Sequence, residues 1–213
     1  SYGQLGNNST TNSSSPVDTG LSNVVSIAAG SQLSCAVLSS GEIKCWGFNN
    51  VGQVGDGTYS NRSVPTTVSN NGLVVKAADG FACATFGDGT MRCWGYNQNG
   101  QLGVGSGSNS HNTPQTISSL TNKVTHFSVG RYSSCAVLNT GAVQCWGNND
   151  SGKLGDGTTT NSNVPVNTQI TSNASKVSVG HSFACALLTN GTVRCWGKGE
   201  WGQLGHGSFT TTS

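Results

Sequence analysis

Residues 35–47 read CAVLSSGEIKCWG, and the same pattern returns as CATFGDGTMRCWG at 83–95, CAVLNTGAVQCWG at 135–147 and CALLTNGTVRCWG at 185–197. The copies recur with a period of about 50 residues, which lies in the range of β-propeller blades. Each copy contains two short runs of β-forming residues, separated by three residues of which the last is glycine. This spacing is typical of a β-hairpin whose loop ends at positive φ. The chain is therefore predicted to be built from repeated hairpins.

The segments on either side of each hairpin repeat as well. An apolar run that ends in glycine precedes each copy, as in VVSIAAG at 24–30, and a glycine-rich turn follows it, as in GQVG at 52–55. The other turns are GQLG at 100–103, GKLG at 152–155 and GQLG at 202–205, and a proline recurs at Pro16, Pro65, Pro114 and Pro165. No segment carries a sustained apolar stripe at helical spacing. The sequence therefore predicts an all-β fold with about four strands per repeat, rather than a helical solenoid.

The glycine-ended run, the hairpin with its central glycine, the Trp-Gly pair and the Gly-Gln-Leu-Gly turn together resemble the RCC1 (regulator of chromosome condensation) repeat. The CWG form with paired cysteines resembles the bacterial and secreted branch of that family. The resemblance covers essentially the whole chain, and it implies an RCC1-like β-propeller. Propellers of this family commonly close seven blades into a ring, and they include exchange factors and secreted enzyme inhibitors.

The number of repeats differs from that blade count. Four hairpins carry CWG, whereas the glycine-rich turn occurs a fifth time, in YGQLG at 2–6. The chain therefore contains about four repeats and a short overlap, the extra turn at its start. A ring of four blades would not need this overlap, so we expect the chain to be part of a seven-bladed ring. A true four-repeat protein that closes on itself or polymerises head to tail is the alternative. The expected organisation is one propeller fragment over 1–213, with a partial repeat at 1–22 and repeats at 23–72, 73–122, 123–174 and 175–213.

The eight cysteines form four C-x9-C pairs, each of which spans one hairpin. If residues 39–41 form the loop, Cys35 faces Cys45, and facing positions of antiparallel strands bring Cβ atoms within about 4.5–5.5 Å of each other. Buried free thiols are the alternative, and a zinc site is disfavoured because the short C-x2-4-C spacing is missing. Disulfides would imply an oxidising, extracellular or cell-surface location. The predicted bridges are Cys35–Cys45, Cys83–Cys93, Cys135–Cys145 and Cys185–Cys195.

The charged residues are too few and too scattered to indicate chemistry. The net charge is only +2, which predicts no binding to nucleic acid, and no apolar run is long enough to predict insertion into a membrane. Asp-Gly-Thr recurs at 56–58 and 156–158, but one carboxylate per turn falls short of a calcium site. The four histidines lie at different phases of the repeat. We therefore expect no catalytic residues, no metal and no cofactor.

The tryptophans of the CWG motifs recur in register, which favours packing between blades over sugar stacking. These residues are Trp46, Trp94, Trp146 and Trp196. Other aromatic residues stand where the other repeats carry different residues, and variable loop positions on a fixed scaffold are plausible anchors for a partner. These candidate partner-binding residues, which ordinary exposed loop aromatics would explain equally well, are Tyr2, Phe48, Tyr59, Tyr96 and Trp201.

A rigid repeated scaffold with variable loops and no catalytic set favours a non-enzymatic, extracellular or surface-exposed propeller. Such a propeller would bind another macromolecule, most plausibly a protein, through its loops. A structural subunit of an extracellular filament, sheath or surface layer, self-assembling through open repeat ends, is the second hypothesis. A polysaccharide-acting enzyme is the third, and it would require carboxylates or histidines that converge at one face.

Overall fold

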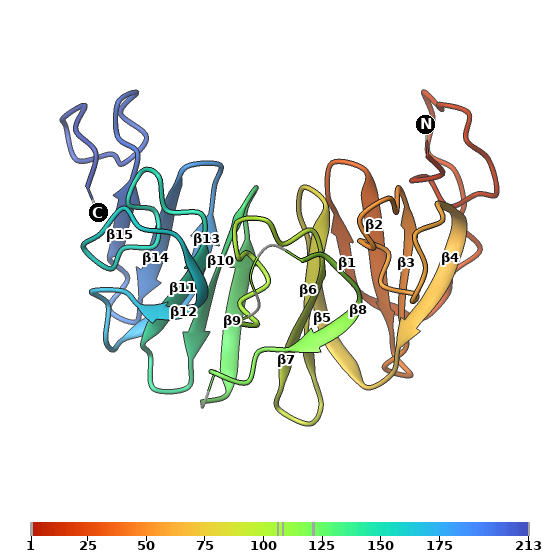
Figure 1. Ribbon diagram of the computed structural model, residues 1–213, viewed down its shortest axis with the longest axis horizontal. Helices are drawn as coiled ribbons and strands as arrows, with labels where there is room; N and C mark the ends of the chain where they lie inside the picture. The colour runs from red at the N-terminus through yellow and green to blue at the C-terminus, as the bar shows by residue number, and fades with distance from the viewer. Residues whose placement is uncertain (1, 106, 108, 121, 213) are drawn as a thin grey trace. The chain divides into compact units, whose positions relative to one another are not determined.

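The computed structural model describes residues 2–105, 107, 109–120 and 122–212. Their regular elements are all β-strands, which form four antiparallel sheets of three or four strands (Figure 1). We call each sheet a blade, because its strands follow one another in the chain and pair with their sequence neighbours, as in a β-propeller. Across the described ranges there is no helix that is long and apolar enough to cross a membrane.

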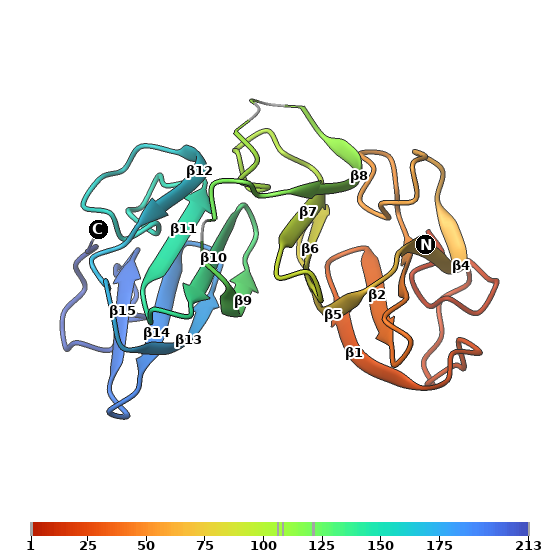
Figure 2. The same cartoon turned by 90° about the horizontal axis from the view of Figure 1, so that it is seen from below.

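The chain divides into two compact units, each with two blades. The first unit, Ser1–Asn97 with Asn109–Thr116, holds the blades β1-β2-β3-β4 and β5-β6-β7-β8. Strand β5 contacts β1 and β2 of the preceding blade, and Figure 2 shows β5 beside β1. The strands are β1 (Val24–Ala29), β2 (Leu33–Leu38), β3 (Ile43–Gly47), β4 (Arg62–Ser69), β5 (Gly72–Ala77), β6 (Phe81–Phe86), β7 (Met91–Gly95) and β8 (His111–Thr116).

The second unit comprises Gln98–Ser108 and Ile117–Ser213. It holds the four-stranded blade β9-β10-β11-β12 and the three-stranded blade β13-β14-β15, and β13 contacts β9 and β10. A single bridge between Gly197 and Thr212 continues the last blade beyond β15. The strands are β9 (Val124–Val129), β10 (Ser133–Leu138), β11 (Val143–Gly147), β12 (Ser162–Asn167), β13 (Ala174–Val179), β14 (Phe183–Leu188) and β15 (Val193–Gly197).

The hairpin at the centre of each blade has the predicted register. In the first blade Cys35 pairs with Cys45 and Val37 with Ile43. The loop closes with a hydrogen bond of 2.8 Å from the Gly41 N–H to the Leu38 carbonyl, and Gly41 has φ +85°, a conformation that a side chain at this position would disfavour. The four predicted disulfides are confirmed.

The last strand of each four-stranded blade contains a proline that the sequence analysis noted only as a marker. Pro65 lies in β4, Pro114 in β8 and Pro165 in β12. Each of these strands is the outer one of its sheet, and its pairing with the hairpin shifts register opposite the cysteine and the glycine of CWG. An outer strand with an irregular register tolerates proline, because a central strand would need the missing N–H.

Each unit has its own hydrophobic core, built from the hairpins and the glycine-rich turns. In the first unit Val37, Ile43 and Val54 pack with Phe86 and Trp94 of the second blade. In the second unit the cluster includes Leu154, Val177 and Trp196. Cys35, Cys45 and the equivalent pair Cys135 and Cys145 are buried within these cores, so the bridges are internal parts of the packing.

Candidate functional site

Every tryptophan of a CWG motif is held by the glycine-rich turn of the preceding repeat. The indole N–H of Trp94 donates a hydrogen bond of 3.1 Å to the Gln53 carbonyl. The equivalent bonds are Trp46 to Gln4 (3.0 Å), Trp146 to Gln101 (2.9 Å) and Trp196 to Lys153 (2.9 Å). All four indoles are buried, and this position joins successive repeats rather than presenting a ring to a ligand.

In each of the four turns that hold a tryptophan, the last glycine makes this contact possible. A Cβ on Gly55 would lie 2.5 Å from Nε1 of Trp94, and one on Gly155 would lie 2.6 Å from Nε1 of Trp196. Both glycines also have positive φ, at +86° and +68°. The turn thus lies directly against the next indole, and its position fixes where the loop after it begins.

A buried asparagine that the sequence analysis missed organises the loop that follows CWG. The Asn49 side-chain oxygen accepts a hydrogen bond from the Val54 N–H (2.8 Å), while its amide donates to the carbonyls of Thr58 (3.1 Å) and Ser60 (3.0 Å). Asn149 makes the same set of contacts with Leu154, Thr158 and Thr160. Its recurrence two residues after the Trp-Gly pair was the signal that would have identified it.

The Asp-Gly-Thr segments belong to the same loop framework. The Asp56 carboxylate accepts hydrogen bonds from the Thr58 hydroxyl (2.7 Å) and from Nε of Arg62 (2.6 Å). Burial raises the pKa of Asp56, but the hydrogen bonds from Thr58 and Arg62 outweigh that effect and leave the pKa below its usual value. In the part of the chain that the structure describes, no three His, Cys, Asp or Glu residues are grouped so that they could hold a metal ion.

The candidate partner-binding aromatics lie in loops and differ in their surroundings. Tyr2 and Phe48 are brought together, with ring centroids 4.4 Å apart. Tyr59 is 57% exposed in the loop before β4, and Tyr96 is partly buried beside the Gly80 backbone. Trp201, in the second unit, is 82% exposed. The other four aromatic residues belong to the first unit.

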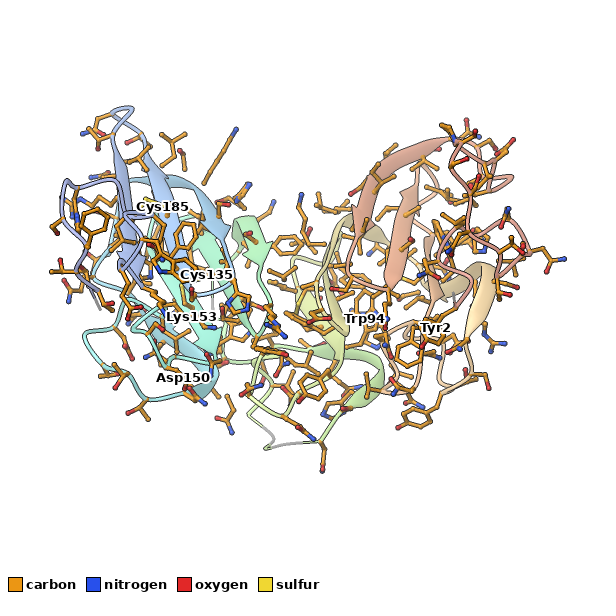
Figure 3. The ribbon with its side chains drawn as sticks, turned by 90° about the horizontal axis from the view of Figure 1, so that it is seen from above. Tyr2, Trp94, Cys135, Asp150, Lys153 and Cys185 are labelled. Carbon is orange, nitrogen blue, oxygen red and sulfur yellow. A yellow bond between two sulfur atoms is a disulfide. The ribbon has the colours of Figure 1, made fainter. Side chains whose placement is uncertain are left out.

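Trp201 borders a hollow of about 680 Å³ in the second unit, which the sequence analysis did not anticipate. The hollow is formed mainly by the loops that follow β11 and β15 and by the turns that precede β10 and β14, and Asn99 adds to its lining. Its lining includes Tyr132, Asp150, Lys153, His181, Phe183 and Trp201. Asp150 and Lys153 lie close together in Figure 3.

Lys153 is the unusual residue of this hollow, because it is a charged side chain that is only 3% exposed. Its ammonium donates a hydrogen bond of 3.2 Å to the His181 carbonyl. Burial lowers the pKa of Lys153 to about 8; the charge of Asp150 opposes this shift and that of Arg131 adds to it. Lysine is rarely buried without a paired charge, so the sequence pattern of the turn gave no reason to expect it inside.

The sequence and the fold both match known proteins. The family model of the regulator of chromosome condensation (RCC1) repeat matches residues 1–37, 40–84, 88–137 and 140–187. A second model of the same repeat matches 24–53, 124–153 and 174–203. These segments carry the hairpins and turns described above.

Three crystal structures show the same architecture. Human WBSCR16 is 27% identical, with a TM-score of 0.86 over 99% of this chain and 58% of that one. Prp20p from Saccharomyces cerevisiae is 20% identical, with a TM-score of 0.74 over 89% of this chain and 49% of that one. The complex of Kap60 with yeast RCC1 (Prp20) gives 20% identity and a TM-score of 0.75, over 89% of this chain and 48% of that one.

The chain thus spans about half of the length of the solved structures that it matches. Its repeats nevertheless match the family model in four consecutive segments that cover most of its residues. This chain therefore belongs to the family of RCC1 repeat proteins.

Proposed function

We propose that this chain is part of a non-enzymatic, extracellular or cell-surface propeller that binds another protein through its variable loops. The observation that carries the proposal is the contrast between a repeated framework and exposed aromatic side chains. Tyr59 projects from the loop whose backbone is fixed by the Trp94–Gln53 hydrogen bond. Trp201 projects from the loop after β15, where its backbone N–H donates a hydrogen bond to the Gln203 side chain. Rigid aromatic anchors bury a large area on binding and lose little conformational entropy.

The relatives support a protein partner. Yeast RCC1 (Prp20) has been solved bound to Kap60, and Prp20p has binding properties to Gsp1p and histones. The identity to these proteins is 20%, so their own partners are not transferred to this chain. The four disulfides favour an oxidising compartment, and in the secreted setting a repeat propeller would meet a different set of proteins.

Affinity capture from the native extracellular fraction, with immobilised wild-type chain and loop variants, tests this function. We expect the wild type to retain a specific protein, and Tyr59→Ala and Trp201→Ala to weaken its retention by about tenfold or more, because an exposed aromatic anchor contributes on the order of 1–2 kcal/mol or more. Ile27→Ala is the matched control, since Ile27 is 75% exposed but lies on a strand, β1, rather than in a loop.

Retention that is equal for all three variants would contradict the role of the loops. Capture of further copies of this chain alone would favour the filament or sheath hypothesis instead. Turnover of a polysaccharide by the purified chain would overturn the non-enzymatic assignment.

A further inference from the structure

The glycine-rich turn occurs five times, and its second position is glutamine in four copies and Lys153 in the other. The glutamine has a structural task, because its side-chain oxygen accepts a hydrogen bond from the backbone N–H two residues earlier. The four bonds are Tyr2 to Gln4 (2.8 Å), Val51 to Gln53 (3.0 Å), Asn99 to Gln101 (3.0 Å) and Trp201 to Gln203 (2.8 Å). A lysine ammonium has no acceptor, so the turn at 152–155 lacks this bond.

Lys153 replaces that bond with a buried positive charge, which is unfavourable unless it is compensated. Its ammonium has three donors, and one hydrogen bond, to the His181 carbonyl, is formed. Within the described residues, the ion pairs join other side chains and none includes Lys153. The charge of Asp150 therefore compensates Lys153 only in part. A local rule that is broken with incomplete compensation is the kind of departure that marks functional sites.

The hollow supplies space for a second negative charge beside Lys153. Lys153 is among its lining residues, and Trp201, Tyr132 and Phe183 give it apolar walls. An acidic side chain that enters the hollow could accept hydrogen bonds from the two remaining ammonium donors. The aromatic walls would then cover the peptide that carries it.

The charges at the rim favour one carboxylate over a polyanion. Arg131 contacts the His181 ring, with 2.6 Å between Nη1 and Nε2, and Lys198 forms an ion pair of 2.9 Å with Glu200. The carboxylates of Asp150 and Glu200 therefore stand near the lysines and would repel a phosphorylated or sulfated polymer. Lys153, Arg131 and Lys198 carry three positive charges against the two negative charges of Asp150 and Glu200, and a single further carboxylate matches the one positive charge that remains.

We infer that this hollow, which we name the Lys153 subsite, receives an aspartate or glutamate side chain of the protein partner. The inference rests on the proposed function, because it specifies the chemistry by which that partner is recognised. The subsite would add recognition of a charge to the binding by the aromatic anchors. It would also explain why the turn at 152–155 carries lysine where the other turns carry glutamine.

Nuclear magnetic resonance of the ¹⁵N-labelled chain tests the subsite with small probes. The Trp201 indole signal, assigned by its loss in Trp201→Phe, is followed during titration with N-acetylglutamate amide. N-acetylglutamine amide is the neutral control, and sodium sulfate represents a polyanionic ligand. We expect a saturable shift with the glutamate probe and none with the glutamine probe.

Lys153→Gln restores the residue of the other four turns and so preserves the fold. We expect it to weaken glutamate binding by about tenfold or more, because a hydrogen bond to a charged group contributes at least about a factor of ten to the affinity. Lys176→Gln removes the same charge from an exposed position on β13 and should leave binding unchanged. Equal binding of both probes, tighter binding of sulfate, or unchanged binding in Lys153→Gln would overturn the inference.

The two proposals fail separately. If the wild-type chain and Lys153→Gln capture a protein partner equally well, the proposed function stands and the subsite is wrong. If the glutamate probe binds through Lys153 but no protein is captured, the subsite stands and the proposed function is wrong.

Discussion

At the scale of single residues, Lys153 shows how a repeat protein individualises one copy of its framework. The turn keeps both glycines and the carbonyl that accepts the Trp196 indole N–H, so the packing between repeats is retained. Only the side chain at the second position changes, from an acceptor that caps the backbone to a buried cation. The substitution therefore sacrifices local stability at the edge of the hollow.

The buried charge predicts a pH-dependent difference in stability between the wild type and Lys153→Gln. Burial lowers the pKa of Lys153 from 10.5 to about 8, so the unfolded chain binds the proton more tightly than the folded one. The charged lysine therefore destabilises the fold by about 3 kcal/mol below pH 8, and this penalty disappears as the pH rises from about 8 to 10.5. We expect Lys153→Gln to be the more stable protein at pH 7, and its advantage to shrink towards pH 10.5 to the part that the regained glutamine hydrogen bond contributes.

Urea unfolding of both proteins across this pH range measures the difference. Asp150, Arg131, His181 and Lys198 also face this hollow or contact its lining, but they are present in both proteins, so the comparison isolates the change at position 153. A stability difference that does not change between pH 7 and pH 10.5 would mean that Lys153 does not titrate in this interval.

At the scale of the secondary-structure element, the hairpins were predictable because their constraints are local. Gly41 and its equivalents fix the loop, the loop fixes the register, and the register brings Cys35 opposite Cys45. The outer strand β4 was not predicted in detail, because Pro65 and a shift of register obscure its pattern. The Lys153 subsite was not predictable either, since Tyr132, His181 and Trp201 are distant in sequence and meet only in the folded blades.

The disulfides predict a distinctive peptide map. Alkylation of the denatured, unreduced chain should label none of the eight cysteines, and alkylation after reduction should label all of them. Trypsin cleaves after Lys44, Arg92 and Arg194, each of which lies between two paired cysteines, so three of the bridges should join separate peptides. The pair Cys135–Cys145 has no lysine or arginine between its members and should remain within one peptide. Peptides joined between different hairpins would contradict the register.

At the scale of the whole molecule, the repeats within each unit contact mainly the repeats next to them in the sequence. The first four turns each pack on the tryptophan of the next repeat, as Gly55 does on Trp94 and Gly155 on Trp196. In such an architecture the effect of a substitution spreads to the adjacent repeat before it reaches any other. A change in a turn should therefore disturb the following blade as well as the loop that contains it.

Gly155→Ala and Gly157→Ala separate these two effects. Both glycines have positive φ, +68° and +83°, so alanine strains the backbone at either position. Only at position 155 does the new Cβ meet an indole, at 2.6 Å from Nε1 of Trp196, whereas at 157 the nearest side-chain atom is Nε2 of Gln169 at 3.6 Å. Because overpacking of this kind costs about 1–3 kcal/mol, we expect Gly155→Ala to be less stable than Gly157→Ala by that amount. Hydrogen exchange should accelerate in β14 and β15 for Gly155→Ala, while Gly157→Ala should change only its own loop. Equal exchange in β14 and β15 for the two variants would show that the Trp–turn contact does not couple neighbouring blades.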